Sequence, residues 1–261
     1  NKLWNANNFL IQNKCNLKNS KKLPKLKINI NKWIYFELLK TSKLIKKNIE
    51  DYRFDEAAKN AYHFAWHKYC DWYLELSKTI IFSDNVKAQK EVKEVSTFVF
   101  RQILIMLHPF IPFVTEKIWL KNKFDNKNKN FLMLSNWIAG KSKKDSDHNH
   151  VQKIINIISE IRSFKNELNV SPGSFIDISI HNIKKNNQSF FKSNEIVIKK
   201  LGRINNLFTK NQNKPAASLL ISGDLFKIYF DANVDLNLIK ENLLKRQSKY
   251  QEEMDKISQR L

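Results

Sequence analysis

The longest run of periodic apolar residues in the chain extends from Asp51 to Leu76. These residues recur at three- and four-residue steps, the spacing that places them on one broad face of an α-helix. They are Phe54, Ala58, Ala61, Tyr62, Ala65, Tyr69, Trp72, Tyr73 and Leu76. Because the segment contains neither Gly nor Pro, we expect its i to i+4 hydrogen bonds to continue without interruption for about seven turns. The pattern predicts a long core helix with partners on several sides.

Further apolar patterns before and after this segment predict a helix bundle. Residues 1–12 read as the end of a helix, and a second helix is expected at about 30–48. A fourth, at about 85–107, must end where Pro109 prevents its continuation. Pro112 suits the first turn of a short helix that runs to Trp119. Helices with large aromatic inward faces and short connections favour a bundle.

After Trp119 the chain becomes polar and then adopts a mixed pattern. Residues 120–150 suggest a tail that wraps the bundle, followed by a linker. The elements expected next are a helix from Val151 to Leu168, a strand with Ile176, Ile178 and Ile180 on one face, a helix from about Gln188 to Leu201 that closes on Gly202, and strands at 204–209, 218–222 and 225–230. Gly223 and Asp224 would join the last two strands as a hairpin.

The chain is therefore expected to be mainly α, with four parts. These are a helix bundle over residues 1–140, a linker at 141–150, a small α/β domain at 151–232 and the start of a helical arm at 233–261. The arm has a heptad-like seam, typical of a coiled coil, formed by Leu243, Gln247, Tyr250, Met254, Ile257 and Leu261. Such a seam needs a partner.

The charge of the chain favours an anionic partner. Its 261 residues carry 46 basic and 25 acidic side chains, a formal net charge of +21, and 40 of the basic residues are Lys. Because Lys acts as a point charge whereas Arg makes forked contacts with base edges, such a surface suits attraction to a phosphate backbone better than sequence reading. The alternative is compositional drift, since Lys, Asn and Ile are enriched together, as AT-rich coding DNA would produce.

Cysteine usage and hydropathy indicate the compartment. Cys15 and Cys70 are too few for a disulfide framework or a zinc site, so a reducing cytoplasm is expected. No apolar run approaches the length of a membrane span, and the N-terminus lacks the layout of a signal peptide. Because the chain begins with Asn rather than Met, we expect it to be a segment of a longer protein.

The candidates for catalysis or metal binding are weak. His63 and His67 are four residues apart on the expected helix, but they lack both the Glu of an HExxH motif and a third ligand. His108 precedes Pro109 and is interpreted as a capping or packing residue. Asp71 and Glu75 are also four apart, and an exposed or anchoring pair is commoner than an acid/base dyad. No Gly-rich phosphate loop occurs among the four Gly. We therefore predict no catalytic residue and no metal site.

Several motifs carry a resemblance to a known family. The run YRFDEAAKNAYHFAWHKYCDWYLEL resembles a helix of the anticodon-binding domain of the valyl-tRNA synthetase family, within the class I aminoacyl-tRNA synthetases, and CDWYLE is its most specific part. NKLWNANNFL at 1–10 is similar to the entry helix of that family. MLHPFIPFVTEKIW at 106–119 and NVSPG at 169–173 extend the likeness through nearly the whole chain. The sister isoleucyl and leucyl families fit CDWYLE less well.

The resemblance implies a site for an anticodon base. In the family, residues that match Phe9 and Leu74 sandwich such a base, and a Lys that matches Lys2 contacts the same loop. Asn8 stands where the family often has Arg. From spacing alone, Lys2 and Phe9 share a helix face and could offer a cation for a phosphate and a ring for a base, although the spacing by itself favours Phe9 as a core residue.

The resemblance also implies a function and partners. The chain would be the anticodon-binding, tRNA-recognition portion of a monomeric synthetase that attaches valine to tRNA(Val), with ATP and Mg²⁺ bound in a catalytic half that carries the HIGH-like and KMSKS-like motifs absent here. The terminal helix would begin an arm that leans on the outer corner of the tRNA. One alternative is a basic helical scaffold or a nucleic-acid-binding module of another class. A self-standing enzyme is the least favoured, because no catalytic constellation is present.

Overall fold

The computed structural model of the chain comprises two units. It describes residues 1–17, 20, 22–124, 131–140, 146–167, 170–181, 185–209, 219–223, 226–230 and 236–258. The first unit spans Asn1–Lys153 and the second Ile154–Leu261. Each is described by itself.

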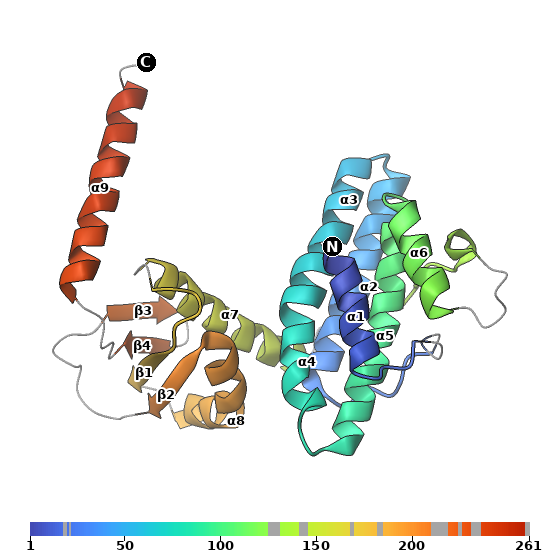
Figure 1. Cartoon of the computed structure of the whole chain (residues 1–261), viewed down its shortest axis with the longest axis horizontal. Coiled ribbons are helices and arrows are strands. Elements are labelled where there is room, and N and C mark those ends of the chain that lie inside the picture. Colours follow the sequence, from blue (N-terminus) through green and yellow to red (C-terminus); the bar gives the residue numbers. More distant parts are fainter. Residues whose placement is uncertain are drawn as a thin grey trace. The chain divides into compact units, whose positions relative to one another are not determined.

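The first unit is a helix bundle (Figure 1). Its elements are α1 (Lys2–Gln12), α2 (Asn29–Glu50), α3 (Phe54–His63), the π-helix η1 (Phe64–Tyr73), α4 (Leu74–Ile81), α5 (Val86–Leu107), α6 (Pro112–Asn122) and the 3₁₀ turn η2 (Leu132–Leu134). Large side chains from α2, η1, α5 and α6 fill the core; among them, Trp33, Tyr69, Tyr73, Phe100 and Trp119 are fully buried. The prediction of a mainly α chain that opens with a helix bundle is confirmed.

The central helix differs from the prediction in its hydrogen bonding. Helical backbone runs from Phe54 to Ile81, but residues 64–73 form a π-helix, so the expected unbroken i to i+4 ladder is wrong. Two residues assigned to its buried face are also exposed: Phe54 is 54% exposed and Tyr62 is 48% exposed. Instead of entering the core, the Tyr62 ring stacks on Trp66, with ring centroids 4.7 Å apart.

The ends of α5 and α6 are fixed by local side chains. The Asn85 side chain caps α5 by accepting a hydrogen bond from the Ala88 amide at 3.0 Å. At the other end, His108 Nδ1 lies 2.8 Å from the Thr115 hydroxyl of α6, which confirms the interpretation of His108 as a packing residue. As predicted, Pro112 occupies the first turn of α6, which ends on Lys123 in the left-handed conformation.

The segment after α6 returns to the bundle. Residues 131–140 contact α2 through Ser42, whose hydroxyl donates to the Ile138 carbonyl at 3.1 Å and whose own carbonyl accepts from the Trp137 indole at 3.4 Å. This part of the predicted wrapping tail therefore lies against the bundle. Residues 125–130 and 141–145 are outside the described residues.

The second unit contains a four-stranded mixed sheet. Its elements are α7 (Ser146–Glu167, which begins in the first unit), β1 (Ile176–His181), α8 (Lys185–Gly202), β2 (Ile204–Thr209), β3 (Leu219–Gly223), β4 (Phe226–Phe230) and α9 (Leu236–Ser258). The strand order is β2-β1-β4-β3, with β1 and β2 parallel and the other neighbours antiparallel. Because Gly223 pairs with Phe226, the predicted hairpin is present, although Asp224 in its turn is outside the described residues.

Two boundary predictions in this region are corrected. The helix expected from Val151 begins at Ser146, so the second half of the expected 141–150 linker is helical. Gly202 is the last residue of α8, and the left-handed residue after it is Arg203, with φ 53°. A Cβ on Gly202 would lie 3.0 Å from Ile204 Cδ1 and 3.6 Å from Ile161 Cγ2, so Gly202 is required for packing rather than for its backbone freedom.

The last helix, α9, displays apolar side chains to solvent. Leu244, Tyr250 and Met254 are each more than half exposed within the described part of the chain. The coiled-coil seam stays a prediction, and its final residue, Leu261, lies outside the described residues. Among the described helices, none is long and apolar enough to cross a membrane.

Candidate nucleic-acid interface

The four residues predicted to contact an anticodon loop lie on α1 and α4. These two helices, together with η1, enclose an open cavity of about 300 Å³ in the first unit. It is lined by Lys2, Asn5, Ala6, Phe9, Cys70, Asp71, Leu74, Glu75 and Lys78. The fold thus brings together three of the four predicted residues: Lys2, Phe9 and Leu74.

Phe9 and Leu74 contribute unequally to this cavity. Phe9 is half-buried, so part of its ring faces the opening, whereas Leu74 is only 5% exposed. The two residues that the resemblance pairs therefore line the same cavity. Phe9 forms an accessible aromatic wall, and Leu74 forms a nearly covered aliphatic floor. A base that enters this cavity would stack mainly on Phe9, because flat rings offer the larger contact area to a nucleobase.

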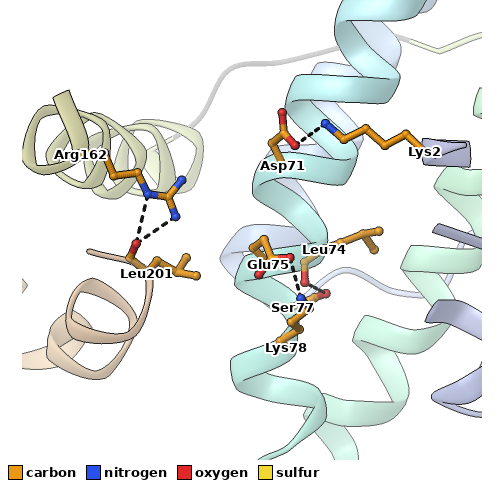
Figure 2. Close-up of polar contacts among 8 residues, drawn as sticks. All are labelled: Lys2, Asp71, Leu74, Glu75, Ser77, Lys78, Arg162 and Leu201. Carbon is orange, nitrogen blue, oxygen red and sulfur yellow. Dashed lines mark hydrogen bonds and ion pairs between the residues drawn. The ribbon is translucent and has the colours of Figure 1, made fainter. Parts of the chain in front are cut away.

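The Lys2 ammonium already has a carboxylate partner. Its Nζ donates to Asp71 Oδ1 at 2.6 Å (Figure 2). His67 Nδ1 lies 3.2 Å from the other carboxylate oxygen. Both members of the Lys2–Asp71 pair remain about one-third exposed. Ion pairs this exposed contribute little net stability, so an incoming phosphate can compete for the ammonium at small cost.

Lys78 is a further cation at this cavity, and it was not predicted from the sequence. Its Nζ pairs with Glu75 at 2.6 Å (Figure 2). The same Nζ lies 5.6 Å from the centroid of the Phe9 ring. Lys78 follows Leu74 by four residues on α4, so it occupies the same helix face one turn later. That four-residue spacing is the sequence signal by which Lys78 could have been found. Two cations, Lys2 from α1 and Lys78 from α4, therefore line the cavity together with Phe9.

Asn8 lies apart from these groups. It is partly exposed on α1 but is not among the residues that line the cavity. Successive residues of a helix point about 100° apart, and on this part of α1 the lining passes from Ala6 to Phe9 without Asn8. Any contact of Asn8 with a nucleic acid would lie outside the cavity.

The π-helix supplies one wall of the cavity. Cys70 and Asp71 lie within η1, and Leu74 follows its last residue, Tyr73. The hydroxyl groups of the two buried tyrosines of η1 fix this segment: Tyr69 donates to the Ser96 carbonyl at 2.8 Å, and Tyr73 donates to Asn31 Oδ1 at 2.7 Å. Irregular π-helical turns are frequent at functional sites. Here the irregular turn presents the residues next to the candidate base pocket.

The histidines and carboxylates near the cavity have structural partners. The rings of His63 and His67 are 5.0 Å apart, and burial, followed by the charges of His67 and Lys68, lowers the pKa of His63. Within the described residues, no group of three potential ligands could hold a metal ion. Asp71 and Glu75 each pair with a lysine, as expected for anchoring carboxylates.

Comparison of the sequence with known proteins shows the family of the chain. Residues 31–180 match the model of the anticodon-binding domain of tRNA ligases, and the chain belongs to that family. Over its whole length, it is 67% identical to a valine–tRNA ligase of Pelagibacter ubique (strain HTCC1062). It is 32% identical to that of Zymomonas mobilis and 30% identical to that of Brucella suis biovar 1. The chain spans about 30% of the length of these relatives.

Proposed function

We propose that this chain is the tRNA-recognition portion of a valine–tRNA ligase, an enzyme that attaches valine to tRNA(Val) using ATP. The observation that carries the proposal is the convergence of Phe9, Leu74 and Lys2 on one open cavity of an anticodon-binding domain. ATP and Mg²⁺ would act in another part of that enzyme. A monomer in the cytoplasm is part of the same proposal.

In this function, an unstacked anticodon base enters the cavity between α1 and α4. The base stacks on the Phe9 ring and rests on the edge of Leu74, and each stacking contact of this kind is worth on the order of 1–3 kcal/mol. Lys2 and Lys78 exchange their carboxylate partners for phosphates beside that base, because both ion pairs are accessible to solvent. Asn8 offers an amide to the same loop from outside the cavity.

The test is the replacement Phe9→Ala, with Phe82→Ala as the matched control. Phe82 is 67% exposed directly after α4 and does not line the cavity, so its removal deletes an accessible ring without touching the site. Filter binding would measure the affinity of each variant for tRNA(Val) and for the same tRNA with a changed anticodon. We expect Phe9→Ala to weaken cognate binding by about 1–3 kcal/mol and to reduce discrimination, with Phe82→Ala close to the parent chain.

Two outcomes would reject the assignment. If Phe9→Ala and Phe82→Ala bind cognate tRNA equally well, the cavity does not hold a base. If the parent chain binds both tRNAs with the same affinity, its positive charge acts without selectivity, and the basic-scaffold alternative is favoured.

A further inference from the structure

A second cavity, within the second unit, is dominated by cations. Its volume is about 400 Å³, and it is lined by Arg162, Lys165, Asn166, Val170, Pro172, Leu201, Gly202 and Arg203. Three of these eight residues are cationic and none is acidic. By contrast, two cations and two carboxylates line the cavity of the first unit.

Neutral backbone oxygens hold the three cations in place. The Arg162 guanidinium donates two hydrogen bonds to the Leu201 carbonyl, at 3.1 and 2.9 Å (Figure 2). Arg203 Nη1 donates to the Gly173 carbonyl at 3.0 Å, and Lys165 Nζ donates to the Ser174 carbonyl. A carbonyl orients a cation without cancelling its charge, so the contacts of Lys165 and Arg203 position positive charge around the cavity.

Keeping Lys165 charged in this arrangement costs free energy when no anion is bound. Its side chain is nearly covered, with the residue only 3% exposed, and burial lowers its pKa, with the positive charges of Arg203 and Arg162 adding to the effect. Within the described part of the chain, no carboxylate pairs with Lys165 or with Arg203. Attraction to an anion in the cavity would offset the cost of burying the Lys165 charge and would reduce the repulsion between the like charges.

Local packing explains why the cavity is present. The Val170 amide donates to the Lys165 carbonyl of α7 at 2.9 Å, which holds Val170 against the last turn of that helix. Val170 and Pro172 then form one wall. On the opposite side, the α8–β2 turn presents Arg203, and Gly202 allows that turn to approach Ile161 and Ile204 closely.

We propose that this second cavity binds a phosphodiester group of the tRNA backbone. The inference rests on the proposed function, which supplies RNA as the partner, and it adds a contact separate from the anticodon pocket. Arg guanidinium groups suit phosphate oxygens because their forked donors match the geometry of the anion. The contact carries no sequence information, since it reads the backbone and not a base.

The test is Arg203→Gln in the whole chain, with Arg203→Lys and Lys192→Gln for comparison. The Arg203 side chain is exposed, so its replacement leaves the buried Lys165 in place. Lys192 lies on the exposed surface of α8 outside the cavity, so Lys192→Gln removes one positive charge from the same unit. Filter binding over a series of salt concentrations gives both the affinity for tRNA and its salt dependence.

We expect Arg203→Gln to weaken binding about three- to tenfold and to lower the slope of log affinity against log salt by about one. The loss should be the same for cognate tRNA and for tRNA with a changed anticodon, and Arg203→Lys should restore the salt slope but only part of the affinity, because Lys keeps the charge and lacks the forked donors. If Arg203→Gln and Lys192→Gln have equal effects, the second cavity is not a phosphate site. That result would not affect the assignment of the cavity between α1 and α4, provided Phe9→Ala still reduces discrimination. A parent chain without discrimination would instead reject the proposed function.

Discussion

The side chain of Glu91 on α5 should be one of the most important polar groups in the first unit. A single oxygen, Oε1, accepts hydrogen bonds at 2.9 Å from the amides of Lys27 and Ile28 and from the side chain of Asn31. Ile28 is the N-cap residue of α2 and offers no capping side chain of its own, so Glu91 caps that helix from a neighbouring one. Asn31 then accepts the hydroxyl of Tyr73, the residue that precedes Leu74.

The replacement Glu91→Ala would remove all three of these interactions. Hydrogen bonds to a charged group contribute about 1.5–3 kcal/mol each when isolated, but bonds that share one oxygen are not additive. Asn31 is fully buried, so its amide would also lose a partner that water cannot easily replace. We expect the free energy of unfolding of the first unit to fall by about 2–4 kcal/mol, within the range for a disrupted polar network.

Tryptophan fluorescence during urea unfolding can measure this change. All six Trp residues of the chain lie between positions 4 and 137, so the signal reports the first unit alone. The control is Glu94→Ala on the same helix, which removes an exposed carboxylate whose only recorded partner among the described residues is Lys90 at 4.0 Å. That variant should lose less than about 0.5 kcal/mol. If the two variants unfold at the same urea concentration with equal slopes, Glu91 does not stabilise α2 as argued.

Two further predictions concern the cations and thiols of the first unit. Lys78→Gln should weaken tRNA binding about three- to tenfold and lower the salt slope by about one, and an equal effect of Lys87→Gln on the exposed start of α5 would contradict a specific role. Burial raises the pKa of Cys70 to about 12 and that of Cys15 to about 11, so the folded chain keeps protons that the unfolded chain releases near pH 9. Stability should therefore fall by up to about 1.4 kcal/mol per pH unit for each thiol, between about pH 9 and 11 for Cys15 and between about pH 9 and 12 for Cys70. A Cys15→Ala/Cys70→Ala variant whose stability, measured by urea unfolding, falls equally steeply over that range would refute this.

The sequence predicts the helices of the bundle well because each has its own apolar period. The helix expected at about 85–107 is observed as Val86–Leu107, and the one expected at about 30–48 as Asn29–Glu50. Proline and capping signals act within a few residues, so the boundaries around Asn85 and Pro112 follow from local chemistry. The hairpin of the second unit is predictable for the same reason, since alternating strands flank a short turn.

The π-helix could not be predicted from apolar spacing. Three- and four-residue steps locate a buried face, but they do not report which carbonyl each amide contacts. In this chain the choice depends on tertiary partners, because Tyr69 and Tyr73 must reach the Ser96 carbonyl and Asn31 on other helices. Arg203 is a similar case: Gly202 is the expected left-handed residue, but contact with Ile161 and Ile204 places it at the end of α8.

The residues of the candidate sites also divide into those that the sequence could predict and those that depend on tertiary packing. The family resemblance predicted Lys2, Phe9 and Leu74 as site residues. It did not predict that Leu74 is nearly buried, because that depends on how α1 packs against the central helix. Lys78 could have been found from its four-residue spacing from Leu74, but its position over the Phe9 ring depends on how α4 packs against α1. The cations of the second unit come from α7 and from the α8–β2 turn, and no linear motif joins those two segments.

The cations of the two cavities differ in their partners, and this difference separates selectivity for a base from general attraction to phosphate. At the cavity between α1 and α4, each cation has a carboxylate partner, so a nucleotide that offers poor stacking would gain little from charge alone. At the second cavity, Lys165 and Arg203 have only carbonyl partners among the described residues, so any phosphate there would be attracted whatever the sequence around it. Selectivity should therefore respond to Phe9 and affinity to Arg203. The double variant Phe9→Ala/Arg203→Gln should show additive losses, because the two contacts share no residue.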